Sequence, residues 1–144
     1  MVDNIATTTS DKSQIGSVAA NQKRVLVVED DSFLGSLLPT RLIKAGFLVT
    51  RASDGEEALE VLGNNKFDLI LLDVILPKKS GFEVMEEIQK NPMLKRVPIV
   101  IISNLGQSED MERGRELGAI EYYIKAQTSI EELVNKTKQL LGVA

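Results

Sequence analysis

The 144-residue sequence contains no cysteine and no histidine. Without cysteine there can be no disulfide, no thiolate nucleophile and no zinc–thiolate site. Without histidine the chain lacks the usual general base, the Ser-His-Asp triad and every imidazole metal ligand. Any chemistry must therefore come from carboxylates, hydroxyls and amines, together with a hard cation bound through oxygen.

Other features are scarce as well. Tryptophan is absent and aromatic residues make up 4% of the chain, so aliphatic residues must form the core. The net charge is -4, which gives no basic field to attract nucleic acid or an acidic membrane surface. No apolar run approaches the roughly 20 residues of a membrane helix, and the N-terminus lacks a signal-peptide pattern. We therefore expect a soluble cytoplasmic protein without direct nucleic-acid or membrane binding.

The length suits one domain with a sizeable core. Residues 1–22 are polar and show no periodicity, which predicts a disordered N-terminal tail. Residues 23–144 form the expected domain, in which five apolar segments alternate with five helical ones. The strands are predicted at residues 25–28, 47–52, within 67–77, 98–104 and 120–125.

This alternation predicts right-handed βαβ units and a parallel sheet covered on both faces. We expect an α/β protein with a doubly wound five-stranded parallel sheet of flavodoxin-like strand order 2-1-3-4-5 and five helices on two faces. The more amphipathic strand 47–52 is expected at an edge. Ligands bind such sheets at the carboxyl ends of the strands, here between strands one and three, where the order reverses.

Capping motifs mark the starts of three predicted helices, and two of the predicted helices contain a residue that disfavours helix. Capping boxes are predicted at Ser53–Glu56, Ser80–Glu83 and Thr128–Glu131. In the first helix Pro39 is expected to cause a mild kink, not a break. The inward face of that helix is predicted to consist of Leu34, Leu37, Leu38 and Leu42. The helix at residues 108–117 contains a glycine, Gly114, which lowers its propensity.

Polar side chains lie at the ends of four predicted strands. Glu29 and Asp30 follow the first strand, and Asp73 follows the third. Ser103 and Lys125 end the fourth and fifth strands. A terminal aspartate is usually a helix cap and a terminal lysine is usually solvated, so each residue alone is weak evidence. Their joint placement at one edge of the sheet favours a common site.

These groups suit phosphoryl transfer. Crowded carboxylates repel one another and favour binding of Mg²⁺, which accepts oxygen ligands. The charge of Lys125 favours the ionised form of Asp73, and such a carboxylate can attack phosphorus to give an acyl phosphate. Lys125, the metal and the Ser103 hydroxyl would then stabilise charge on the transferring group.

From residue 23 onward the sequence resembles a response-regulator receiver domain of two-component signalling. The motifs that carry the resemblance are 27–31 (VVEDD), 71–77 (LLDVILP) with Gly81, 101–104 (IISN) and 117–125 (LGAIEYYIK). The resemblance implies that Asp73 accepts phosphate from a phosphohistidine of a histidine kinase or phosphotransfer protein. It also implies that Asp30, Asp73 and the backbone carbonyl of Ile75 ligate Mg²⁺ directly. Glu29 would act on the metal through water.

The resemblance further implies a switch. Ser103 and Lys125 would contact the phosphoryl group, and Ser103 would move toward it while Tyr122 turns inward. We expect the motion in the helix that contains Gly114. The chain would be a stoichiometric phosphoacceptor and not an enzyme, a monomer or a weak phosphorylation-dependent dimer, and its downstream target would be an unidentified protein.

The sequence departs from the family pattern after Lys125, where Ala126 replaces the usual proline, so a cis peptide bond is not expected there. Ile75 and Leu105 lie two residues after the acceptor and the hydroxyl, and both are apolar. We hypothesise that they slow dephosphorylation by excluding the hydrolytic water.

Three other functions are compatible with a fold of this kind. A phosphorylation-independent adaptor would keep the fold, but all the reactive groups of the site are present here. A carboxylate-nucleophile phosphatase usually has a second acid two residues after the nucleophile, where this chain has Ile75. A flavin-binding relative would need a phosphate loop after the first strand, where Glu29 and Asp30 would repel phosphate.

Overall fold

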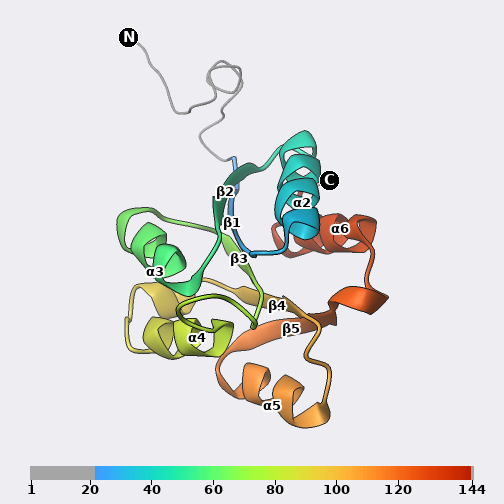
Figure 1. Ribbon diagram of the computed structural model, residues 1–144. Coiled ribbons are helices and arrows are strands. Elements are labelled where there is room, and N and C mark those ends of the chain that lie inside the picture. Colours follow the sequence, from blue (N-terminus) through green and yellow to red (C-terminus); the bar gives the residue numbers. More distant parts are fainter. Residues whose placement is uncertain (1–21, 144) are drawn as a thin grey trace.

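A computed structural model describes residues 22–143, so the predicted tail lies outside the described residues except for Gln22. The strands form one parallel sheet in the order β2-β1-β3-β4-β5, which confirms the predicted fold and the edge position of β2 (Figure 1). In chain order the strands are β1 Arg24–Val28, β2 Leu48–Ala52, β3 Leu69–Leu72, β4 Ile99–Ser103 and β5 Ala119–Ile124.

Helices cover both faces of this sheet, with α2 and α6 on one face and α3, α4 and α5 on the other (Figure 1). None of the helices within residues 22–143 is long and apolar enough to span a bilayer. The α-helices are α2 Ser32–Lys44, α3 Gly55–Asn64, α4 Gly81–Gln89, α5 Ser108–Glu116 and α6 Ile130–Leu140. Two short 3₁₀ helices are η1 Leu94–Arg96 and η2 Lys125–Gln127.

An apolar cluster fills the space on each side of the sheet. Successive strand residues point to opposite faces. Leu26 and Ile70 therefore join the cluster beneath α3 and α4, while Val25 and Leu71 join the one beneath α2 and α6. All residues of β3 are buried, as expected for a central strand covered on both faces.

One prediction for the inward face of helix α2 is wrong. Leu38 and Leu42 are buried as predicted, but the Leu37 side chain is 40% exposed. Only a stripe of the helix faces the sheet, and residues 38 and 42, four apart, occupy it. The side chain of Leu34 lies outside the described residues. Pro39 lies within a continuous helix, which confirms that it does not break α2.

The capping box of α4 at Ser80 is confirmed, but the one predicted at Ser53–Glu56 is wrong, because the cap of α3 lies one residue later. Helix α3 is capped by Asp54, whose Oδ1 accepts a hydrogen bond from the Glu57 amide at 2.8 Å. The Glu57 carboxylate accepts in turn from the Ser53 amide at 2.8 Å. Both adjacent polar residues fit the cap spacing, so the pattern alone could not choose between them.

The capping box of α6 is shifted in the same way. Ser129, and not Thr128, is the cap, and its partner is Glu132 instead of Glu131. The Thr128 hydroxyl donates to the Ile124 carbonyl at 2.8 Å, which satisfies it within the preceding turn.

A glycine fixes the loop after β3. A Cβ atom on Gly81 would lie 2.2 Å from the Asp73 carbonyl oxygen, so only glycine lets α4 begin this close to the strand end. The Gly81 amide also donates to the Val74 carbonyl at 2.7 Å. Residues 74–80 therefore fold back tightly, which leaves Asp73 at the sheet edge.

Candidate functional site

Two acidic residues follow the adjacent strands β1 and β3. The Glu29 amide donates to the Ala52 carbonyl at 3.0 Å, and the Asp73 amide donates to the Val28 carbonyl at 3.0 Å. Both residues thus continue the hydrogen-bond ladder beyond the strand ends. Both are only 3% exposed, whereas Asp30 is exposed. The sheet itself therefore brings two buried carboxyl groups together.

Glu29, Asp30 and Asp73 form a carboxylate cluster. Each offers an oxygen, and these oxygens lie within 4.8 Å of one another. This donor set fits a hard divalent cation that prefers oxygen ligands. Ile75, predicted as a carbonyl ligand, lies in the loop beside the cluster, and its amide donates to Asp73 Oδ1 at 3.2 Å.

Lys125 lies at the start of η2, because β5 ends one residue earlier than predicted. Its Nζ atom lies 2.7 Å from Asp73 Oδ2 and 2.7 Å from Glu29 Oε2. One ammonium group therefore pairs with two buried carboxylates. The contact with Asp73 follows the predicted placement, but no signal in the sequence indicated the contact with Glu29.

Burial raises the pKa of Glu29 to about 7. The Lys125 ammonium and the Asp31 amide oppose this increase, and the Asp73 charge adds to it. Burial alone would lower the pKa of Lys125, but its hydrogen bonds to Asp73 and Glu29 outweigh burial and raise it. The cluster therefore holds excess negative charge, which a second cation would relieve.

On the other side of the site, Ser103 ends β4 and is fully buried. Its Oγ atom accepts a hydrogen bond from the Leu105 amide at 3.3 Å. The Tyr122 hydroxyl donates to the Leu105 carbonyl in the same loop. Burial, with the charge of Asp110, raises the pKa of Tyr122. The loop that follows Ser103 is thus joined to the aromatic residue predicted as part of the switch.

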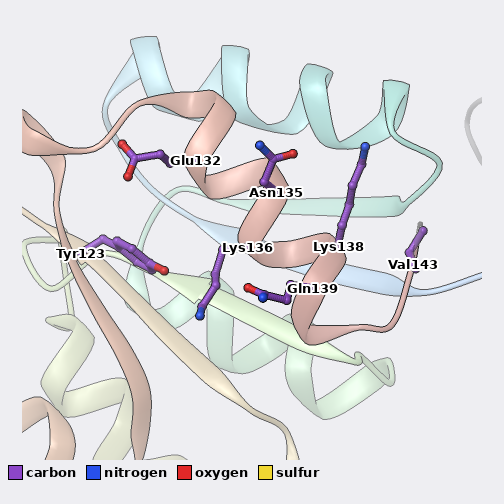
Figure 2. A pocket seen from close by; sticks show the side chains of 7 residues that line it. All are labelled: Tyr123, Glu132, Asn135, Lys136, Lys138, Gln139 and Val143. Atoms are coloured by element: carbon purple, nitrogen blue, oxygen red, sulfur yellow. The ribbon is translucent and has the colours of Figure 1, made fainter.

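The neighbouring Tyr123 lies on the opposite face of the sheet, since adjacent strand residues alternate. It packs at the edge of the cluster beneath α2 and α6. Tyr123 lines a shallow pocket of about 570 Å³ together with residues of α6, among them Glu132 and Lys136 (Figure 2). Tyr123 therefore lies on the α6 side of the sheet, and Tyr122 is the tyrosine whose hydroxyl bonds the loop after β4.

Gly114 is buried where α5 crosses β5. A Cβ atom there would lie 2.7 Å from Ile101 Cδ1 and 3.1 Å from Tyr122 Cδ2. The glycine therefore allows close packing behind Tyr122, in addition to lowering helix propensity. The predicted motion of this helix stays a prediction.

One contact at the site could not be predicted from the sequence. The Lys125–Ala126 bond is trans, as expected, and the Ala126 amide donates to Asn104 Oδ1 at 3.1 Å. Asn104 belongs to the motif at residues 101–104, and the alanine at position 126 shows that a backbone N–H group exists there. Nothing in the sequence shows that the two residues meet.

Comparison with known proteins gives a consistent result. The family model of the response regulator receiver domain matches residues 25–138. A gliding motility regulatory protein of Myxococcus xanthus is 40% identical over 123 residues, which cover 85% of this chain and 16% of that protein. Other relatives are named probable transcriptional regulators, and the chain spans less than half of their length.

Solved structures show the same likeness. The receiver domain of a Francisella response regulator is 29% identical, with a TM-score of 0.77 and coverage of 84% of this chain and 98% of that one. The receiver domain of a Pseudomonas aeruginosa sensor histidine kinase, with magnesium coordinated in its active-site cleft, is 25% identical, with a TM-score of 0.75 and coverage of 84% and 98%. The family match, the sheet order and the placement of the acidic cluster agree. The chain belongs to the response regulator receiver domain family.

Proposed function

We propose that the protein is a phosphorylation-dependent signalling switch in which Asp73 accepts a phosphoryl group from a phosphohistidine. The donor would be a histidine kinase or a phosphotransfer protein in the cytoplasm. The observation that carries the proposal is the pairing of Asp73 with Lys125 within a cluster of three acidic residues. This arrangement supplies a nucleophile, positive charge beside it and oxygen ligands for a cation.

In the proposed reaction an Asp73 carboxylate oxygen forms a bond to phosphorus as the phosphorus–nitrogen bond of the donor breaks. The electron pair of that bond remains on the imidazole nitrogen. Lys125 Nζ, 2.7 Å from Asp73 Oδ2, lies where it can pair with a phosphoryl oxygen once the acyl phosphate forms. The Ser103 hydroxyl lies on the loop that would bring a hydrogen bond to the same group.

Mg²⁺ is the proposed cofactor. Asp30 and Asp73 would hold it directly together with the Ile75 carbonyl, and Glu29 would act through water. When bound, the ion would neutralise charge on the phosphoryl oxygens. The clustered oxygens within 4.8 Å support this proposal, since a cation beside Lys125 would relieve the repulsion between the carboxylates.

Phosphorylation would add about two negative charges at the site. Ser103 and Lys125 would move toward the new charge. The hydroxyl of Tyr122, on β5, donates to the Leu105 carbonyl in the loop that follows Ser103. The altered loop and β5 face would then bind a downstream protein. The protein would act as a stoichiometric acceptor, as a monomer or a weak dimer.

The test is incubation with Mg²⁺ and acetyl phosphate, followed by intact-protein mass measurement. The wild type is expected to gain one phosphoryl group, and Asp73→Asn is expected to gain none. Asp68→Asn is the matched control, because Asp68 accepts from the Arg24 amide at the other end of the sheet. No gain in the wild type would contradict the proposal and favour a phosphorylation-independent adaptor.

A further inference from the structure

Two loops that carry site residues are joined by a side chain outside the proposed reaction. Asn104 directly follows Ser103, and Ala126 directly follows Lys125. Asn104 Oδ1 accepts a hydrogen bond from the Ala126 amide at 3.1 Å. The backbone that carries the hydroxyl and the backbone that carries the ammonium are therefore linked one residue beyond each functional group.

The bond meets a requirement of the turn that places the lysine. The first amides of a helical turn have no partner within it. In η2, Lys125–Gln127, the preceding residue Ile124 supplies no side-chain cap. Asn104 therefore serves as a cap from a different loop. A proline at position 126 would have no amide hydrogen and could not form this bond.

A second contact holds the loop after β4 against the end of β5. A Cβ atom on Gly106 would lie 3.0 Å from Ile124 Cδ1, so the loop after β4 packs closely on the end of β5. Tyr122 bonds the same loop through the Leu105 carbonyl. The Asn104 bond extends this connection beyond β5 to the turn that begins with Lys125.

We propose that Asn104 is a positioning residue for Lys125. Through the Ala126 amide it orients the turn that directs the ammonium group to Asp73, and it makes Ser103 and Lys125 approach the phosphoryl group together. This inference rests on the proposed phosphoacceptor function. Asn104 touches no reacting atom and acts only through the backbone of residues 125 and 126.

The experiment compares Asn104→Ala, Ala126→Pro and the double variant by their initial rates of phosphorylation with acetyl phosphate and Mg²⁺. Loss of one hydrogen bond corresponds to a decrease of roughly fivefold for Asn104→Ala. Ala126→Gly, which keeps the amide, is expected to react at nearly the wild-type rate. In the Ala126→Pro background, Asn104→Ala is expected to have no further effect, because the donor is already absent.

Two outcomes would overturn the proposal in this comparison. One is a wild-type rate for Asn104→Ala. The other is the same rate change on replacing Asn104 whether residue 126 is alanine or proline, which would show a direct effect of the side chain on donor access.

Asn91→Ala is the matched control for stability. Asn91 Oδ1 accepts from the Met93 amide at 2.9 Å, far from the site at the other end of the sheet. This variant is expected to lose stability but not rate, and an equal slowing would show that the Asn104 effect is not positional.

The hydrogen bond itself can be measured without phosphorylation, from the temperature coefficient of the chemical shift of the Ala126 amide proton. This value is expected to change in Asn104→Ala, and an unchanged value would overturn the proposal. Failure of the wild type to react would instead contradict the proposed function, so the two failures are distinguishable.

Discussion

The two sides of the site are held by different forces. In the acid side, defined as Glu29, Asp30 and Asp73, the two buried residues Glu29 and Asp73 lie on backbone that continues the ladders of β1 and β3. The loop side is defined as the loop at residues 104–106 and the turn that begins with Lys125, together with Ser103 and Tyr122, which lie on β4 and β5. Its loop and turn are joined to each other and to Tyr122 by side-chain hydrogen bonds to backbone. Ladder bonds therefore hold the two buried acids, whereas side-chain bonds hold the loop and the turn that follow β4 and β5.

This difference indicates how one site can be both rigid and responsive. Breaking the ladder bonds of the acid side would disrupt the central sheet. Each side-chain bond of the loop side contributes only about 1 kcal/mol, so a change in charge at the site can exchange it for another. The acid side would fix where the phosphoryl group binds, and the loop side would report its presence.

The largest expected effect comes from removing the contact between the two sides. Lys125→Met leaves Glu29 and Asp73 buried without their cation, and the free energy of unfolding at pH 8 should fall by about 3 kcal/mol. Chemical denaturation at pH 8 without Mg²⁺ measures this decrease in the free energy of unfolding. Lys136→Met is the control, since its partner Glu121 is more exposed and water screens the pair, so a smaller loss is expected. Equal losses would contradict the comparison.

A cation should stabilise the acid side specifically. Mg²⁺ at ten times its dissociation constant should raise the free energy of unfolding by about 1.4 kcal/mol. The shift of the thermal midpoint on adding Mg²⁺ measures this. Asp30→Asn should remove most of the shift, whereas Glu112→Gln, the loss of an exposed charge on α5, should not. A full shift in Asp30→Asn would exclude this residue as a ligand.

The packing behind the loop side gives a smaller effect. Gly114→Ala should lower the free energy of unfolding by about 1 kcal/mol, because its Cβ would crowd Ile101 and Tyr122 and outweigh the gain in helix propensity. Gly63→Ala in α3 meets nothing within 4 Å and should raise it by about 0.5–1 kcal/mol. Thermal denaturation of both variants checks the opposite signs. Stabilisation by Gly114→Ala would show that α5 can shift to accommodate the added methyl group at little cost.

The smallest expected effect concerns the access of water to the acyl phosphate. Ile75 is 56% exposed beside the acid side. If its side chain excludes water, Ile75→Asn should shorten the lifetime of the acyl phosphate severalfold, as measured by phosphate release. Ile120→Asn, a similar change at a residue 50% exposed on β5, should leave the lifetime unchanged. An unchanged lifetime in Ile75→Asn would exclude this role.

Much of the site could be predicted from the sequence because its residues follow strands. A buried strand is recognisable from its apolar run, and the doubly wound order then places the residues after β1, β3 and β4 at one edge. The misplaced caps of α3 and α6 have a different origin. At each site two neighbouring polar residues fit the same spacing, and only the path of the chain selects one.

The sequence by itself determined the strand order, the acidic edge and the exclusion of cysteine and histidine chemistry, since these depend on residue type and local periodicity. Tertiary structure decided which groups touch. The pairing of Lys125 with Glu29 and the bond from Ala126 to Asn104 join residues 96 and 22 positions apart. Such contacts arise only when the sheet has brought the ends of its strands together, because nothing local relates the two partners.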